Sequence, residues 1–467
     1  MPETLYAERY RPQFHFTAAH GWLNDPNGLV YYDGEYHLFF QHNPDSVEWG
    51  NMTWGHAVSP DLLHWRQLPN ALLPDEMGTM FSGSAVVDWE NTAGFQTGTH
   101  KTLVALYTAA GDHSPESKGK PFTQCLAYST DRGRTWTKYA GNPVLPHIKG
   151  ANRDPKVIWH AGTRQWIMAL YLDGRDFTFY ASPDLKRWTH LHDLTVRDCD
   201  ECPDFFELPV EGAAEEHEAN ETRWVWVAAN GRYLVGQFDG RRFTPEAEHG
   251  PDPQTGEYTA HVSDYGANFY AVQTYSDIPQ ADGRRIQIAW MFKASYPGMP
   301  FNQQMSFPCE LTLHRTPEGF RLRRRPVREI ALLHDTAVLQ ADVPLQDGET
   351  VLAESADTLW HITAVLEPRG ARELGLRVAG EAISYDVVSQ QLTCLDRSAP
   401  CELIDGRLAL EVLVDRTSIE VFANDGCVSL SSCCLPADLT SRVAAYASGG
   451  AARLVSLEAH TMRSIWR

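Results

Sequence analysis

Short apolar runs bounded by Gly, Pro, Asn or Asp recur along the whole chain, and helical periodicity is nearly absent. Runs of this length between turn residues are typical of β-strands. The pattern therefore predicts an all-β protein. Five runs illustrate it: Tyr36–Gln41, Leu103–Thr108, Trp166–Leu172, Trp224–Ala229 and Ile286–Met291.

A short motif follows four of these runs. Ser59-Pro-Asp-Leu-Leu-His-Trp65 is echoed by Ser129–Trp136, Ser182–Trp188 and, more loosely, Phe238–Phe243. Repetition at this scale favours propeller blades, each a small sheet packed against its neighbours. With a further segment around residues 270–290, residues 1–325 are predicted to form a five-bladed β-propeller. The Ser129–Trp136 copy also fits the Asp-box of sialidases, which we interpret as a hairpin device whose Asp bonds the turn backbone.

The character of the chain changes after Arg321–Arg325, a basic cluster that we interpret as a solvated boundary segment. Residues 326–341 are predicted to be a linker. Beyond Asp342 the alternation of apolar and polar residues continues without the motif. Asn424-Asp-Gly426 is a strong signal for a β-hairpin turn. A C-terminal β-sandwich over residues 342–467 is the natural second domain.

Composition and charge restrict the partners. The 467 residues carry 40 basic and 60 acidic side chains, a formal net charge of −20, which disfavours nucleic acid. A neutral sugar is unaffected by that charge, and the 14 Trp suit a site that contacts the apolar face of a ring. No apolar stretch approaches membrane-spanning length, so no membrane partner is expected.

The nine cysteines are an odd number in a long chain, which fits free thiols in a reducing compartment. Cys199 and Cys202 have metal or redox spacing, but no second pair completes a zinc site, and we interpret both as packing residues. The N-terminus has no basic stretch followed by an apolar core. A cytoplasmic location is the expectation.

The sequence supports hydrolysis or group transfer catalysed by carboxylates. It contains no P-loop, dinucleotide-binding fingerprint, His-Glu-x-x-His or Gly-x-Ser-x-Gly motif. Three acidic residues have unusual neighbours: Asp25 in Trp22–Gly28, Asp154 in Arg153-Asp-Pro155, and Glu201 in Asp200–Asp204. At the entry to the innermost strands of different blades they would meet at the central channel. Cleavage of a glycosidic bond needs such a set, although each motif alone is also compatible with turn chemistry.

The chain resembles glycoside hydrolase family 32, the β-fructofuranosidases, which include invertases, levanases and inulinases. The resemblance rests on Trp22–Gly28, Arg153–Pro155 and Glu201-Cys202 as three signature blocks. Supporting blocks follow in order over essentially the whole chain: Phe40–Pro44, Trp49-Gly50, Phe81–Ala85, Gly141–Val144, Asp264–Ala271 and Asp415–Phe422. Cys309 departs from the pattern, since an Arg is common there.

The resemblance implies that Asp25 is the nucleophile, Glu201 the acid/base and Asp154 the transition-state stabiliser. It implies no cofactor and no metal. The fructosyl unit would be hydrogen-bonded by Asn24, Gln41, Ser82 and Arg153 and walled by Trp49, Phe81, Tyr270 and Trp290.

The resulting hypothesis is a retaining exo-β-fructosidase that acts on fructo-oligosaccharides, levan- or inulin-type fructans and sucrose. Retention predicts that the Asp25 and Glu201 carboxyls lie about 5–6 Å apart. Three alternatives stay open: a fructosyltransferase of the same fold, an inverting arabinan- or xylan-cleaving propeller, and a sugar-binding propeller without catalysis.

Overall fold

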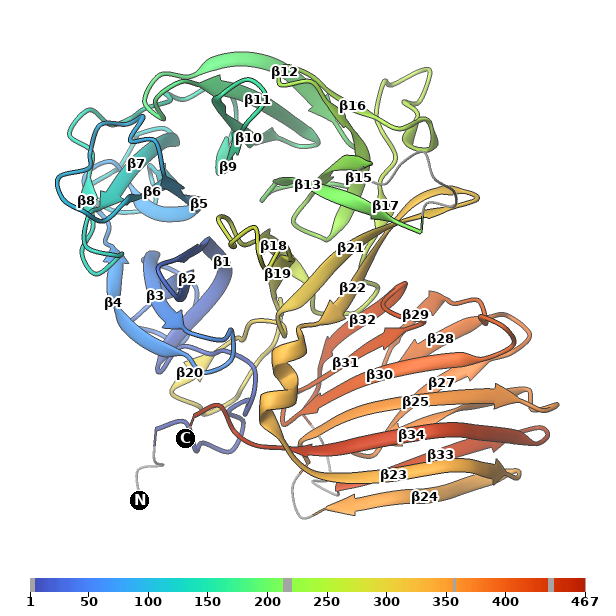
Figure 1. Ribbon diagram of the computed structural model, residues 1–467. Helices are drawn as coiled ribbons and strands as arrows, with labels where there is room; N and C mark the ends of the chain where they lie inside the picture. Colours follow the sequence, from blue (N-terminus) through green and yellow to red (C-terminus); the bar gives the residue numbers. More distant parts are fainter. Residues whose placement is uncertain (1–4, 213–220, 356–357, 436–440, 467) are drawn as a thin grey trace.

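The computed structural model describes residues 5–212, 221–355, 358–435 and 441–466. It has the predicted fold: a five-bladed β-propeller followed by a β-sandwich, packed side by side (Figure 1). In the described ranges, none of the helices combines the length and the apolar character of a membrane span. The two helical segments are short 3-10 turns, η1 (Ala247–His249) and η2 (Arg328–Leu333).

Each blade is an antiparallel sheet whose first strand lies innermost. Blade I consists of β1 (Gly21–Tyr32), β2 (Glu35–Asn43), β3 (Thr53–Ser59) and β4 (Arg66–Leu72), with β20 (Phe301–Asn302) added beside β1. Blade II consists of β5 (Thr79–Asp88), β6 (Thr102–Ala110), β7 (Thr123–Ser129) and β8 (Thr137–Lys138). Blade III consists of β9 (Arg153–His160), β10 (Gln165–Asp173), β11 (Asp176–Ser182) and β12 (Thr189–Thr195).

Blades IV and V share one sheet. Blade IV consists of β13 (Asp204–Glu211), β14 (Thr222–Val227), β15 (Arg232–Phe238) and β16 (Phe243–Pro245), with β17 (His261–Val262) beside β15. Blade V consists of β18 (Tyr270–Thr274), β19 (Arg285–Trp290), β21 (Cys309–Thr316) and β22 (Gly319–Pro326), and β21 pairs in parallel with β13. The innermost strands β1, β5, β9, β13 and β18 contact one another in order, and β18 contacts β1, which closes the ring.

The recurring motif makes the turn between the third and fourth strand of blades I to IV. Asp61 Oδ1 accepts the backbone N–H groups of residues 63 and 64, and Asp131, Asp184 and Asp239 bond their own turns in the same way. The interpretation of the motif as a hairpin device is therefore confirmed. Each of the five predicted runs overlaps the second strand of a blade.

Apolar side chains fill the interfaces between the blades. Trp54 and Tyr107 pack between blades I and II, with ring centroids 6.3 Å apart, and Phe179 and Phe205 pack between blades III and IV, 5.0 Å apart. All four are buried. Because each blade buries both faces against its neighbours, the ring stabilises the positions of its innermost strands.

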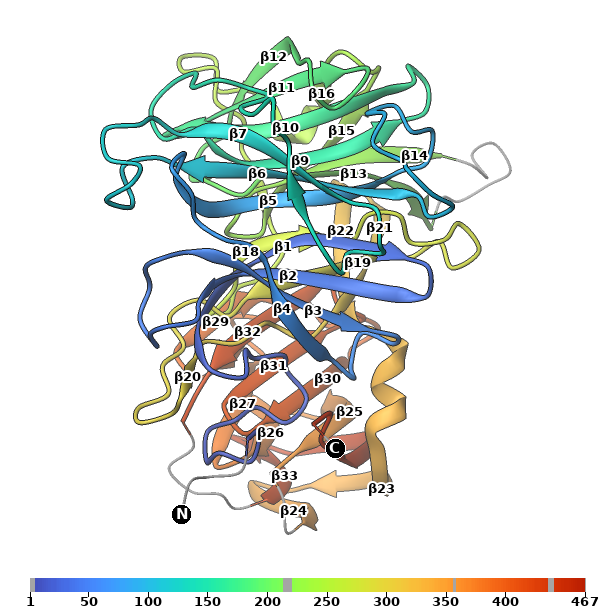
Figure 2. The same cartoon turned by 90° about the vertical axis from the view of Figure 1, so that its left-hand side faces the viewer.

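The C-terminal domain is a sandwich of two six-stranded sheets, at the lower right of Figure 1 and below the propeller in Figure 2. The first contains β23 (His334–Leu345), β25 (Trp360–Pro368), β30 (Leu408–Asp415), β31 (Ser418–Ala423), β32 (Val428–Cys433) and β34 (Ala452–Met462). The second contains β24 (Gly348–Ser355), β26 (Glu373–Val378), β27 (Glu381–Asp386), β28 (Gln391–Cys394), β29 (Arg397–Pro400) and β33 (Ser441–Ser448). The predicted 424–426 hairpin joins β31 to β32.

Only a short segment connects the domains. The propeller's last strand, β22, ends at Pro326, and β23 begins at His334, so residues 326–341 contain η2 and the first part of the sandwich.

The basic cluster lies at the domain interface, and its interpretation as a solvated boundary segment is wrong for Arg324. Arg324 on β22 is buried, and its Nη1 lies 2.7 Å from Asp264 Oδ2. Arg323 and Arg325 extend toward the sandwich hairpin, where they lie 3.1 and 2.7 Å from Asp425. Strand alternation explains the difference, because successive side chains of β22 face opposite directions.

The segment from Asp264 to Asn268 also contacts the sandwich directly. Asp264 Oδ2 accepts a hydrogen bond of 2.7 Å from Ser431 Oγ, and Asn268 Oδ1 accepts one of 2.8 Å from the N–H of Cys433. Between them, Gly266 approaches β32 so closely that a Cβ there would lie 2.0 Å from the carbonyl oxygen of Ser431. This stretch, which we name the latch segment, joins the fifth blade to the sandwich.

Candidate active site

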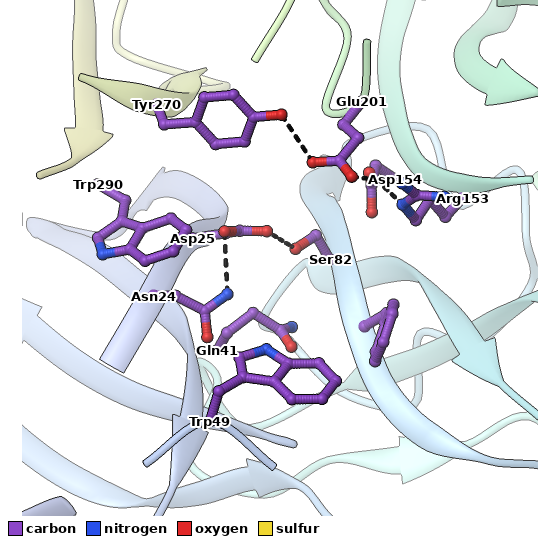
Figure 3. A pocket seen from close by; sticks show the side chains of 11 residues that line it. Asn24, Asp25, Gln41, Trp49, Ser82, Arg153, Asp154, Glu201, Tyr270 and Trp290 are labelled. Carbon is purple, nitrogen blue, oxygen red and sulfur yellow. Dashed lines mark hydrogen bonds and ion pairs between the residues drawn. The ribbon is translucent and has the colours of Figure 1, made fainter. Parts of the chain in front are cut away.

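One cavity at a mouth of the propeller channel brings together every residue predicted for the site (Figure 3). It has a volume of about 160 Å³, which is the space of about five waters and therefore suits a single sugar ring. Its walls come from all five blades. The lining residues are Asn24, Asp25, Gln41, Trp49, Phe81, Ser82, Arg153, Asp154, Glu201, Tyr270 and Trp290.

Asp25 is presented by an irregular stretch of β1. The register between β1 and β2 shifts between Leu23 and Pro26, a bulge that turns the side chain toward the channel. Its Oδ1 accepts a hydrogen bond of 3.0 Å from Asn24 Nδ2, and its Oδ2 accepts one of 2.5 Å from Ser82 Oγ. Burial raises the pKa of Asp25 above its ordinary value, the two hydrogen bonds lower it, and the charge of Glu201 raises it.

Asp154 is the most enclosed of the three carboxylates. It is the second residue of β9 and has a φ of 64°, a conformation that a non-glycine residue adopts at a cost. Its Oδ2 accepts the backbone N–H of Cys202 at 3.1 Å and lies 3.6 Å from Arg153 Nε. Burial raises the pKa of Asp154 to about 7; Arg153 opposes this shift, and Glu201 adds to it.

Glu201 approaches the cavity from the loop before β13. Its backbone is also left-handed, with a φ of 50°. The Arg153 guanidinium forms an ion pair with Oε1, and the Tyr270 hydroxyl lies 2.9 Å from Oε2 and 3.2 Å from Oδ1 of Asp200. A cation and a phenol from two other blades therefore fix the direction of this carboxyl group.

Cys202 corrects one prediction. Both cysteines of the 199/202 pair are buried free thiols, as packing residues would be, but Cys202 also contacts the catalytic candidates. Its Sγ lies 3.4 Å from Asp154 Oδ2 and 3.7 Å from Asp25 Oδ2. In the sequence, the position of Cys202 directly after the candidate acid Glu201 was the signal for a place in the site. Burial and the neighbouring carboxylates raise the pKa of this thiol, so it stays protonated and is a donor to them.

Aromatic rings wall the cavity. Trp49 is half exposed at the mouth, where its ring centroid is 6.0 Å from that of Phe81. Trp290 is buried, and its Nε1 donates a hydrogen bond of 2.9 Å to Gln303 Oε1. His113 extends this wall, with its ring centroid 5.0 Å from that of Phe81, and it lies in no motif that would have identified it.

Within the described residues, one group of potential metal ligands has suitable spacing: Glu248, His249 and His261. Both ring nitrogens of His249 are engaged by the backbone: Nδ1 lies 3.0 Å from Thr259 O, and Nε2 accepts the N–H of Val235 at 3.0 Å. His261 Nε2 lies 3.1 Å from Arg321 Nη1. We interpret the group as a structural polar cluster.

A propeller that gathers three carboxylates, an arginine and aromatic rings around a pocket of one-ring size defines a sugar-processing hydrolase. Residues 15–326 match the N-terminal domain of glycosyl hydrolases family 32, and residues 331–461 match the C-terminal domain of the same family. The chain belongs to this family, and it is a glycoside hydrolase.

Individual relatives agree with the family match. The levanase of Bacillus subtilis is 39% identical over 508 residues, which cover 99% of this chain and 72% of the relative. The extracellular exo-inulinase of Aspergillus niger is 31% identical, with 99% and 96% covered. The crystal structure of the exo-inulinase from Aspergillus awamori superposes with a TM-score of 0.87 at 28% identity, covering 99% of this chain and 100% of that one.

Proposed function

We propose that the protein is a retaining exo-β-fructosidase in which Asp25 is the nucleophile, Glu201 the acid/base and Asp154 the transition-state stabiliser. The observation that carries the proposal is the convergence of these carboxylates, from three blades, on one small pocket. The partners of the Asp25 and Glu201 carboxylates differ. Asp25 is bonded by neutral donors, whereas Glu201 lies between a cation and a phenol.

In the first step Asp25 attacks the anomeric carbon of the terminal fructosyl unit. The new bond joins an Asp25 oxygen to that carbon as the glycosidic bond breaks, and Glu201 gives its proton to the departing oxygen. In the second step Glu201 takes a proton from water, the water oxygen bonds to the anomeric carbon, and the Asp25 ester bond breaks. Two displacements retain the configuration.

The remaining residues position the sugar. Asn24 and Ser82 hold the Asp25 carboxylate in a fixed orientation, so no reorganisation is needed at the moment of attack. Asp154, held by the Cys202 N–H, accepts hydrogen bonds from ring hydroxyls as positive charge develops on the ring. Trp49, Phe81 and Trp290 present apolar surfaces to the carbon-bound hydrogens of the sugar ring.

The substrates we propose are terminal β-fructosides of levan- and inulin-type fructans, fructo-oligosaccharides and sucrose. Relatives include levanases and exo-inulinases. A fructofuranosidase of Schwanniomyces occidentalis, 25% identical with a TM-score of 0.85, has been crystallised with fructosylnystose. The volume of the pocket supports removal of one terminal unit at a time.

Product analysis tests the proposal. Chromatography of digests of sucrose, inulin, levan and fructosylnystose should show fructose as the first product, with equal glucose and fructose from sucrose. An excess of glucose over fructose would instead indicate transfer to a sugar acceptor. Proton NMR of fresh product should show the β anomer first, because an inverting enzyme would release the α anomer.

Variants test the residue roles. Asp25→Ala should lower kcat by on the order of 10³-fold or more, and Glu201→Gln by about 10²- to 10⁴-fold. Unchanged turnover by Asp25→Ala would revive the hypothesis of a propeller that only binds sugar.

We also propose a cytoplasmic location, supported by the cysteines. All nine are free, and six of them are buried. Fractionation of the producing cells with an antibody would test it, and recovery in the culture medium would contradict it.

A further inference from the structure

A second cavity lies at the opposite end of the propeller channel. Strand β9 begins at the catalytic pocket with Arg153 and ends at His160, and β19 ends at the pocket with Trp290 and begins at Arg285. His160 and Arg285 both line the second cavity, which therefore opens at the far mouth. Its volume of about 420 Å³ falls in the range of small-molecule sites. We name it the far-mouth cavity.

Aromatic faces form one side of the far-mouth cavity. The His160 ring lies 5.7 Å from Trp224 and 5.3 Å from Phe238, measured between centroids, and Trp224 and Phe238 are 5.3 Å apart. Three rings from two blades thus meet around one space. Such rings offer apolar surface of the kind that suits the apolar face of a sugar.

Charged groups form the other side of the far-mouth cavity. Glu207 is an exposed residue of β13 whose carboxylate accepts a hydrogen bond from Thr222. Arg285 donates through Nη1 to the carbonyl oxygen of Tyr275 at 3.0 Å, and its Nε is buried without a hydrogen-bond partner. A buried donor without a partner costs free energy, so this guanidinium has hydrogen-bonding capacity that the protein itself does not use.

The local charges select the ligand class. Burial lowers the pKa of Arg285, and the nearby carboxylates of Asp204, Asp277 and Glu207 oppose that shift. An anion is disfavoured there, and the net charge of −20 disfavours it further. A neutral ligand with an apolar face and many hydroxyl groups satisfies both sides of the cavity.

We propose that the far-mouth cavity is a second, non-catalytic binding site for a fructosyl unit of the substrate. The identity of the sugar rests on the proposed function, whereas the cavity and its donors do not. A polymer could occupy both mouths of one molecule or bridge two molecules, and a second contact raises the apparent affinity for long chains without any change at the catalytic pocket. A disaccharide gains nothing from it.

Titration calorimetry with fructosylnystose tests the site directly. In an Asp25→Ala background, which removes turnover, the protein should bind at two sites. Adding Ala161→Trp, which fills the cavity from an exposed turn, should leave one site. Glu207→Gln is the milder second variant, and it should weaken the second site. Glu211→Gln is the matched control, because Glu211 is an exposed carboxylate on the same strand and is not part of the lining.

Kinetics give an independent readout. In the active enzyme, Ala161→Trp should raise KM for levan or inulin polymer without a matching rise for sucrose. A single calorimetric site that Ala161→Trp leaves intact, together with an unchanged polymer KM, would overturn the proposal. If the wild-type protein failed to cleave fructans but still showed a site sensitive to Ala161→Trp, the proposed function would fail while the cavity's sugar binding stood.

Discussion

The imidazole of His15 lies 2.8 Å from Asp415 Oδ2, although 400 residues separate the two in the chain. Its other ring nitrogen lies 2.6 Å from Glu420 Oε2, and all three side chains are fully buried. The two carboxylates raise the pKa of His15 to about 9 against the effect of burial. A charged histidine therefore fastens the N-terminal segment to strands β30 and β31 of the sandwich.

This arrangement predicts that stability falls at alkaline pH. A histidine whose folded pKa is raised from 6.5 to about 9 contributes its full stabilisation below pH 6.5 and loses it as pH rises through 9. The shift corresponds to about 3 kcal/mol. Urea unfolding of the wild-type protein between pH 6 and 10 should show the decline, and His15→Gln should abolish that slope.

The His15→Gln protein should also be less stable at pH 6 by about 3–5 kcal/mol, because two buried carboxylates lose their cation. His64→Gln is the control: His64 is 42% exposed and pairs only with Asp61, so its loss should cost less than about 1 kcal/mol. Equal effects of the two substitutions would contradict the assignment.

Ser82→Ala should shift the pH profile of catalysis. The serine hydroxyl stabilises the ionised form of Asp25, so its removal raises the pKa of the nucleophile. A hydrogen bond to a charged group is worth roughly 1.5–3 kcal/mol, which corresponds to about one pH unit or more. The acidic limb of kcat/KM for sucrose should move upward by this amount. A uniform loss at every pH would argue that Ser82 acts only by packing.

Cys202→Ala should lower kcat/KM by roughly fivefold, the value of one weak hydrogen bond. Loss of the S–H donor leaves Asp154 with less support for its ionised form, so activity near neutral pH should suffer more than activity at high pH. Cys199→Ala is a matched control, since Cys199 is also a buried free thiol but packs in the apolar core between blades III and IV. It should change stability and leave the pH profile in place.

Gly266→Ala should loosen the interface between the domains. The added methyl group would lie 2.0 Å from the Ser431 carbonyl oxygen, so the latch segment must move away from β32. Overpacking of this kind costs about 1–3 kcal/mol. Differential scanning calorimetry should show a lower Tm, whereas Gly98→Ala, which meets nothing within 4 Å, should have almost no effect. A Tm unchanged in both variants would show that the interface adapts.

The architecture was predictable because its signals are local. Turn residues and short apolar runs determine the strands, and the repeated aspartate turns, such as the one at Asp131, mark four of the five blades. The acidic residues of the site could be identified because each lies in a distinctive short motif, and the structure places all of them around one cavity.

Contacts between distant segments were not predictable in this way. Arg324 lies between two partly exposed arginines, and it is buried where β22 meets Asp264 and the sandwich hairpin. The contact of Cys202 with Asp25 depends on two left-handed residues in succession, a backbone feature that no composition rule encodes. Cys309, the departure from the family pattern, is buried on β21, 3.8 Å from the Arg324 guanidinium on the neighbouring strand β22.

The latch segment ends two residues before Tyr270, whose hydroxyl contacts Glu201. The described residues of the sandwich contribute no side chain to the pocket lining, but through the latch segment they constrain the partner of the proposed proton donor. Exchange of C-terminal domains between family members should therefore preserve the pairing of residues 264–268 with their β32 counterparts. A chimaera that lacks this pairing would have an intact pocket in which Glu201 is misaligned.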